Sequence, residues 1–80
     1  MTEFEILTKA AQEKGYAGVE FQVVWEGHNV YDCTFHETPE ELGVAGLPVY
    51  LWLEGDKVIW ADGKQYISIT KTKLKLKAAN

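Results

Sequence analysis

The sequence predicts an α+β fold in which an N-terminal helix precedes about five antiparallel strands, arranged as a two-layer roll or a small barrel. Three observations lead to this expectation. A helix-start pattern stands at Thr2, apolar and polar residues alternate from Val19 onward, and two-residue turn signals separate the later β-rich runs. The chain has 80 residues, 46% of them hydrophobic, which fits one packed domain over 1–80.

The N-terminal helix is predicted from the residues at its two ends. Thr2 and Glu5 have capping-box spacing, so each can satisfy a free backbone N–H group of the first turn. An apolar stripe that includes Leu7 follows with helical spacing. Gly15 can adopt the left-handed conformation that closes a helix. The helix is therefore expected to end near Lys14.

A hairpin should follow the helix. The first strand carries apolar residues at every second position from Val19 to Trp25, and a second run between Tyr31 and Phe35 repeats this period. Keeping both apolar sets on one face requires an even register, which a three-residue loop over 27–29 supplies. This register places Trp25 beside Tyr31 and Phe21 beside Phe35.

The middle of the chain departs from the period of two. Thr38, Pro39 and Glu41 match the N-cap, first-turn proline and capping-box positions of a short helical turn. Glycines then punctuate the longest connection, which ends near Pro48.

The last part of the chain is predicted to be a meander. Two-residue hairpin signals at Gly55–Asp56 and Asp62–Gly63 divide the run from Pro48 to Thr70 into three strands. Pairing across the first turn sets Glu54 against Lys57. Lysines alternate with threonine and leucine after this run, which favours an edge strand or a frayed tail over 71–80.

Charge and composition restrict the function classes. The net charge is −4, but residues 1–42 carry nine acids against two lysines, whereas residues 43–80 carry six lysines against three acids. All basic residues are lysines, and the absence of arginine disfavours nucleic-acid binding. One cysteine, an acidic start unlike a secretion signal and no apolar run long enough to span a membrane lead us to expect a cytoplasmic protein.

One cluster of polar residues could suggest catalysis or a metal site: His28, Asp32, Cys33, His36 and Glu37. On a strand, His28, Asp32 and His36 would lie about 13 Å apart at each step of four residues. Cys33 would point to the opposite face of the strand. A thiol–imidazole pair or a metal site needs side chains that converge. We therefore interpret the cysteine as a small buried hydrophobe and predict no catalytic residue, cofactor or metal.

The second face of the meander is the candidate binding surface. It carries Tyr50, Trp52, Ile59 and Tyr66, residue types that are common at protein interfaces. The alternative is that the helix or the first hairpin covers these side chains and makes them part of a core. Exposure of the four residues separates the two interpretations.

The sequence indicates a small acidic, non-enzymatic domain, most simply a protein-interaction or accessory module. Its partner is expected to be another protein or a second copy of the chain. Two alternatives stay open. One is an electrostatic inhibitor or nucleic-acid mimic that binds a basic protein surface, and the other is a small Cys/His-dependent or metal-dependent enzyme built on Cys33, His28 and His36. No motif points to a known family.

Overall fold

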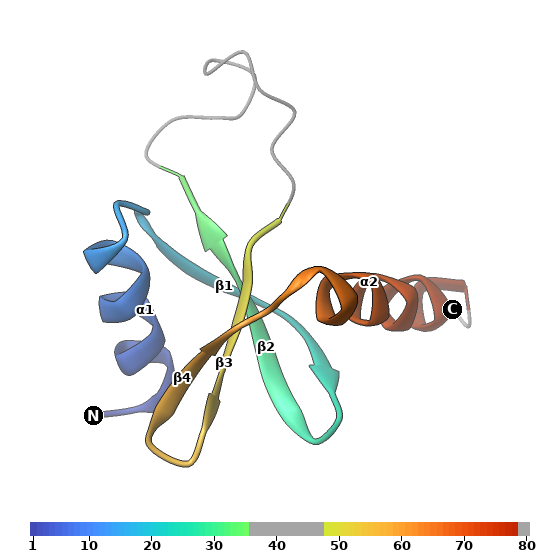
Figure 1. Cartoon of the computed structure of the whole chain (residues 1–80), viewed down its shortest axis with the longest axis horizontal. Coiled ribbons are helices and arrows are strands. Elements are labelled where there is room, and N and C mark those ends of the chain that lie inside the picture. Colours follow the sequence, from blue (N-terminus) through green and yellow to red (C-terminus); the bar gives the residue numbers. More distant parts are fainter. Residues whose placement is uncertain (36–47, 79–80) are drawn as a thin grey trace.

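The computed structural model describes residues 1–35 and 48–78 (Figure 1). It confirms the α+β class. The elements in chain order are α1 (Glu3–Glu13), β1 (Gly18–Trp25), β2 (His28–Thr34), β3 (Tyr50–Glu54), β4 (Lys57–Trp60) and α2 (Gly63–Ala78). The four strands form an antiparallel sheet in the order β1-β2-β3-β4. The expected short turn over 38–41 lies outside the described residues.

The two helices pack on opposite faces of the sheet (Figure 1). On one face, α1 buries Leu7 and Ala11 against strand residues; we call this group the α1-side cluster, and it comprises Leu7, Ala11, Val19, Tyr31, Cys33 and Leu51. On the other face, α2 contributes Ile69 to the α2-side cluster, which comprises Val23, Trp25, Val30, Tyr50, Trp52 and Ile69. Alternation along each strand sends successive side chains to opposite faces, so one thin sheet feeds two cores.

Helix α1 has the ends that the sequence predicts. The Thr2 hydroxyl accepts a hydrogen bond from the Glu5 backbone N–H at 3.2 Å, and the Glu5 carboxylate accepts one from the Thr2 N–H at 3.4 Å. Lys14 caps the C-terminal end, and Gly15 follows with a φ of 97°. A left-handed φ at this position is favourable for glycine because it has no Cβ.

The first hairpin exists, but its predicted turn and register are wrong. The turn is the two-residue pair Glu26–Gly27, with φ values of 49° and 80°, instead of a three-residue loop. His28 therefore pairs with Trp25, and Phe21 pairs with Tyr31. A bulge between Phe21 and Val23 changes which face the apolar residues of β1 point to. Val19 therefore lies in the α1-side cluster with Tyr31, whereas Val23 and Trp25 lie in the α2-side cluster, so the single apolar face expected for this hairpin is divided between the two faces.

The β3–β4 hairpin has the predicted register. Glu54 pairs with Lys57 and Leu51 with Trp60 across the turn at Gly55, which has a φ of 64°. Pairing to the first hairpin runs through Tyr31 and Leu51, which sit opposite each other on β2 and β3.

The predicted third meander strand is wrong, and so is the edge strand over 71–78, because Gly63–Ala78 forms helix α2. Residues 79–80 of the expected edge strand or frayed tail lie outside the described residues. Asp62 starts it: the Gln65 N–H donates to the Asp62 carboxylate at 2.8 Å, and the Gln65 side-chain oxygen accepts from the Asp62 N–H at 2.9 Å. This reciprocal capping converts an expected Asp62–Gly63 turn into a helix start. The sheet thus keeps four strands in its described part and stays open, so neither the fifth strand nor the barrel is present there. No helix in 1–35 or 48–78 is long and apolar enough to cross a membrane.

Candidate functional site

Helix α2 crosses the strands instead of running along them (Figure 1). Its first turn follows β4, and Tyr66 then stacks on Tyr50 of β3. Further along, Lys73 hydrogen-bonds to Gln22 of β1, the strand at the far edge of the sheet. The side of α2 that carries Tyr66 and Thr70 therefore faces the start of β3, near Pro48.

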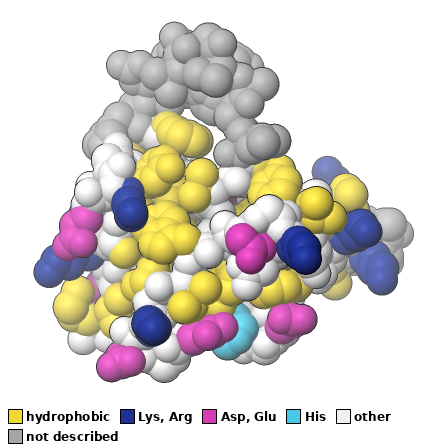
Figure 2. Space-filling view, in the orientation of Figure 1, with side chains coloured by type: hydrophobic (Ala, Val, Ile, Leu, Met, Phe, Trp, Pro, Cys, Tyr) yellow, Lys and Arg dark blue, Asp and Glu magenta, His cyan; other side chains and the backbone are white. Residues whose placement is uncertain are grey.

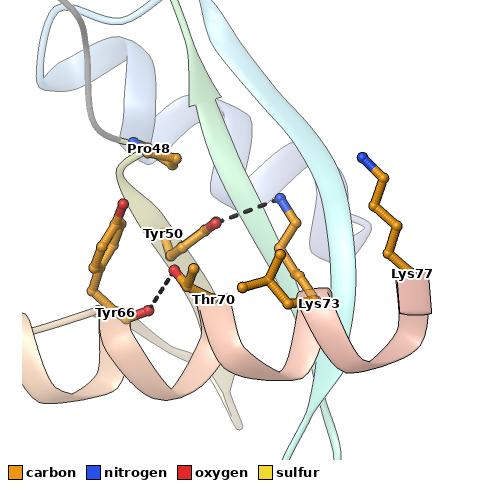
Figure 3. A pocket seen from close by; sticks show the side chains of 7 residues that line it. Pro48, Tyr50, Tyr66, Thr70, Lys73 and Lys77 are labelled. Atoms are coloured by element: carbon orange, nitrogen blue, oxygen red, sulfur yellow. Dashed lines mark hydrogen bonds between the residues drawn. The ribbon is translucent and has the colours of Figure 1, made fainter. Parts of the chain in front are cut away.

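A groove lies between this side of α2 and the start of β3 (Figure 3). Its volume is about 320 Å³. Helix α2 supplies five of the residues that line the groove. Successive turns of the helix contribute them at spacings of three and four, which places them along one face of the helix. The full lining is Pro48, Tyr50, Tyr66, Thr70, Lys73, Leu74 and Lys77.

Two tyrosines form the aromatic wall of the groove. The rings of Tyr50 and Tyr66 lie 5.5 Å apart at an interplanar angle of 28°. Tyr50 is almost fully buried, with 3% of its surface exposed, whereas Tyr66 is partly exposed. The Thr70 hydroxyl donates to the Tyr66 backbone carbonyl at 2.8 Å, and Thr70 lines the groove beside the two rings. The wall is therefore aromatic, and the buried Tyr50 ring supports the partly exposed Tyr66 ring.

Two lysines place positive charge along the same groove (Figure 3). The Lys73 ammonium lies 5.6 Å from the centre of the Tyr50 ring and donates to Gln22 Oε1 at 2.7 Å. Its Nζ is also 3.5 Å from Tyr50 Oη. These contacts fix Lys73 over the aromatic face, a favourable place for a cation. Lys77, one turn further along, is exposed and carries the second charge.

A half-buried carboxylate holds the chain where it enters the groove. Asp32 Oδ1 accepts a hydrogen bond from the Val49 N–H at 3.3 Å, which fixes the residue between Pro48 and Tyr50. Burial raises the pKa of Asp32, while the Val49 N–H and the Lys73 charge act in the opposite direction. The carboxylate is thus used internally to position the start of β3.

The four residues predicted to bind a partner converge, but α2 covers most of them. Trp52 is 1% exposed within the α2-side cluster, and Ile59 and Tyr66 pack against the same cluster as partly buried residues. Of the four, Tyr50 and Tyr66 line the groove. Of the predicted aromatic face, Tyr50 and Tyr66 thus reach the groove, whereas Trp52 and Ile59 do not line it.

The cysteine and histidines do not form a site in the described residues. Cys33 is buried in the α1-side cluster, and burial followed by the neighbouring Asp32 charge raises the pKa of its thiol to about 11. His28 stacks on Trp52, a member of the cluster on the other face. His36 and Glu37 lie outside the described residues. Within the described part, no group of three or more His, Cys, Asp or Glu residues is placed to hold a metal.

Sequence reasoning missed the helical half of the groove because it assigned this segment to a strand. The signal was present: Asp62 and Gln65 have capping-box spacing, and Tyr66, Thr70 and Lys77 recur at helical intervals behind them. Comparison of the chain with protein-family models, curated proteins and solved structures finds no match. The function is therefore argued from the chemistry of the groove.

Proposed function

We propose that this protein is a non-enzymatic protein-interaction module that binds an acidic segment of a partner protein in the groove between α2 and the start of β3. One observation carries the proposal, namely that Lys73 and Lys77 stand beside a stacked pair of tyrosines in a single depression. An apolar wall with adjacent charge is the combination that peptide-recognition sites use for affinity and orientation.

The lining defines the chemistry of the bound segment. An aliphatic or aromatic side chain packs on Tyr66 and Leu74, and a carboxylate one or two positions away pairs with Lys77. The volume of about 320 Å³ lies at the low end of small ligand sites, which run from about 300 to 1,000 Å³, and suits a few side chains better than a folded surface. Lysine presents a point charge, so the site tolerates variation in the position of the acid.

A selection from a displayed peptide library tests the proposal. The full chain serves as bait, and the expected consensus has Asp or Glu flanking a large apolar residue. Recovery of sequences rich in Lys and Arg would contradict it and favour the electrostatic inhibitor, which uses the acidic first half of the chain. Recovery of no consensus would also count against the groove.

Two matched lysine variants localise the binding. Lys77→Gln removes a charge at the groove, whereas Lys75→Gln removes an equal charge from the same exposed end of α2 at a position that does not line it. Exposed ion pairs contribute about 0.2–1 kcal/mol, so Lys77→Gln should weaken binding of the selected peptide about 1.4- to fivefold by fluorescence polarisation. Lys75→Gln should have a smaller effect. Equal losses would mean that only the net charge matters.

A further inference from the structure

Strand β1 forms one edge of the described sheet, on the opposite side from β4. It has eight residues, twice the length of β4, and pairs only with β2 in that sheet. Backbone groups of an edge strand that point away from its neighbour can pair with another strand. The bulge between Phe21 and Val23 divides β1 into regular stretches over 18–21 and 23–25, and the longer of these is the template for such pairing.

Apolar side chains border this edge on both faces of the sheet. On the α1 side, Phe21 is 50% exposed and Val24 is 55% exposed. On the α2 side, the last turns of α2 extend past β1 (Figure 1), and Leu76 is 54% exposed there. Leu76 lies seven residues after the fully buried Ile69 and so on the same side of the helix, but beyond the sheet that covers Ile69. A further strand beside β1 would lie beneath it.

The charges at this edge are complementary within one chain. Glu20 pairs with Asp32, which pairs with Tyr50 of the α2-side cluster, so Glu20 faces the α2 side of the sheet. Beyond Lys73, which contacts β1 through Gln22, the last turn of α2 carries the exposed Lys75 and Lys77, and Figure 2 shows lysine side chains gathered at this end of the molecule. A strand added to the edge should therefore bear acid on the face that meets these lysines.

We propose that the occupant of this edge is a second copy of the chain, docked by antiparallel pairing of β1 with β1. This arrangement has twofold symmetry, so one contact set occurs twice. It brings Glu20 of each copy toward the α2 lysines of the other and places both copies of Phe21 and Val24 at one seam. The strand that each copy needs is the strand that the other copy offers.

Sedimentation equilibrium of the full chain over a range of concentrations tests this inference. The wild-type chain should show a concentration-dependent monomer–dimer equilibrium that weakens with salt. Leu76→Lys and Phe21→Lys should each raise the dimer dissociation constant about tenfold or more, since each removes buried apolar area twice per dimer. Ile67→Lys adds the same charge to the same helix at an equally exposed position, 54% exposed, on the side of α2 opposite Ile69 and Leu76, and should leave the equilibrium within about twofold.

Three outcomes would overturn the inference: a monomer at every concentration reached, dimers that persist in both edge variants, or equal weakening by Ile67→Lys. Circular dichroism confirms that each variant is folded, and the two edge variants lie on different elements, so loss of one to misfolding leaves the other decisive. Phe21→Lys should still bind the selected peptide, because Phe21 does not line the groove. Failure of the dimer and failure of the groove are therefore separable.

Discussion

Two isoleucines in α2, only two positions apart, should differ strongly in their effect on stability. Ile69 is fully buried at the centre of the α2-side cluster, and Ile67 is 54% exposed. In a helix the two side chains point about 160° apart, whereas in a strand they would share a face. Replacing each with alanine thus tests the docking of α2 and the choice of helix over strand together.

The magnitudes follow from burial. Ile69→Ala removes three buried carbons at about 0.8 kcal/mol each and leaves a partial cavity, for a loss of about 3 kcal/mol. Ile67→Ala forfeits about half of the transfer term without a cavity, and the better helix propensity of alanine returns part of it, so the net loss is about 0.5 kcal/mol. A domain of this size has about 4–12 kcal/mol in total, so only the first variant approaches unfolding.

Thermal denaturation monitored by tryptophan fluorescence measures both variants. Trp25 and Trp52 lie in the α2-side cluster, with their ring centres 5.2 Å apart, and report its integrity directly. Ile69→Ala should lower the melting temperature by about 10–20 °C and Ile67→Ala by only a few degrees. Similar losses in the two variants would refute the helical assignment and favour the meander strand.

Three further predictions concern a turn, a cap and a pH dependence. Glu26→Asn should raise the free energy of unfolding by about 0.5–1 kcal/mol in thermal melts, because Glu26 has a φ of 49° and asparagine tolerates this region better. Asp62→Ala should cost about 1 kcal/mol by the same assay through loss of the α2 cap. The free energy of unfolding should fall as pH rises from 9.0 towards about 11. Burial raises the pKa of the Cys33 thiol, so deprotonation in this range favours the unfolded chain. In urea titrations at several pH values, Cys33→Ala should show a smaller fall.

Local signals were sufficient for the parts of the fold whose geometry is set within a few residues. The Thr2 cap fixed the start of α1, and the Gly55–Asp56 turn fixed the β3–β4 register. The first hairpin was predicted wrongly because unbroken alternation from Val19 to Trp25 indicates one apolar face. The bulge between Phe21 and Val23 instead sends Val19 to the α1 side and Val23 and Trp25 to the α2 side, and both faces are covered by a helix.

The C-terminal segment shows where pattern reading alone is insufficient. Its alternating lysines have a β-like period, and Asp62–Gly63 is a hairpin signal, yet Asp62 caps a helix through Gln65. Packing decides between these readings, because Trp52 and Tyr50 need cover on the second sheet face and a crossing helix supplies it through Ile69. The groove could not be predicted without knowing that α2 crosses the strands. Two of its residues, Tyr50 and Tyr66, were nevertheless among the predicted binding residues.

Backbone and lysine side-chain NMR of the isotope-labelled chain, titrated with the selected acidic peptide, tests the central claim most directly. Shifts should concentrate at Tyr50, Tyr66 and Thr70 and at the ammonium-adjacent carbons of Lys73 and Lys77, on the one face that lines the groove. Signals of α1 should stay in place. Shifts centred on α1 and its glutamates, or spread evenly over every lysine of α2, would contradict the account.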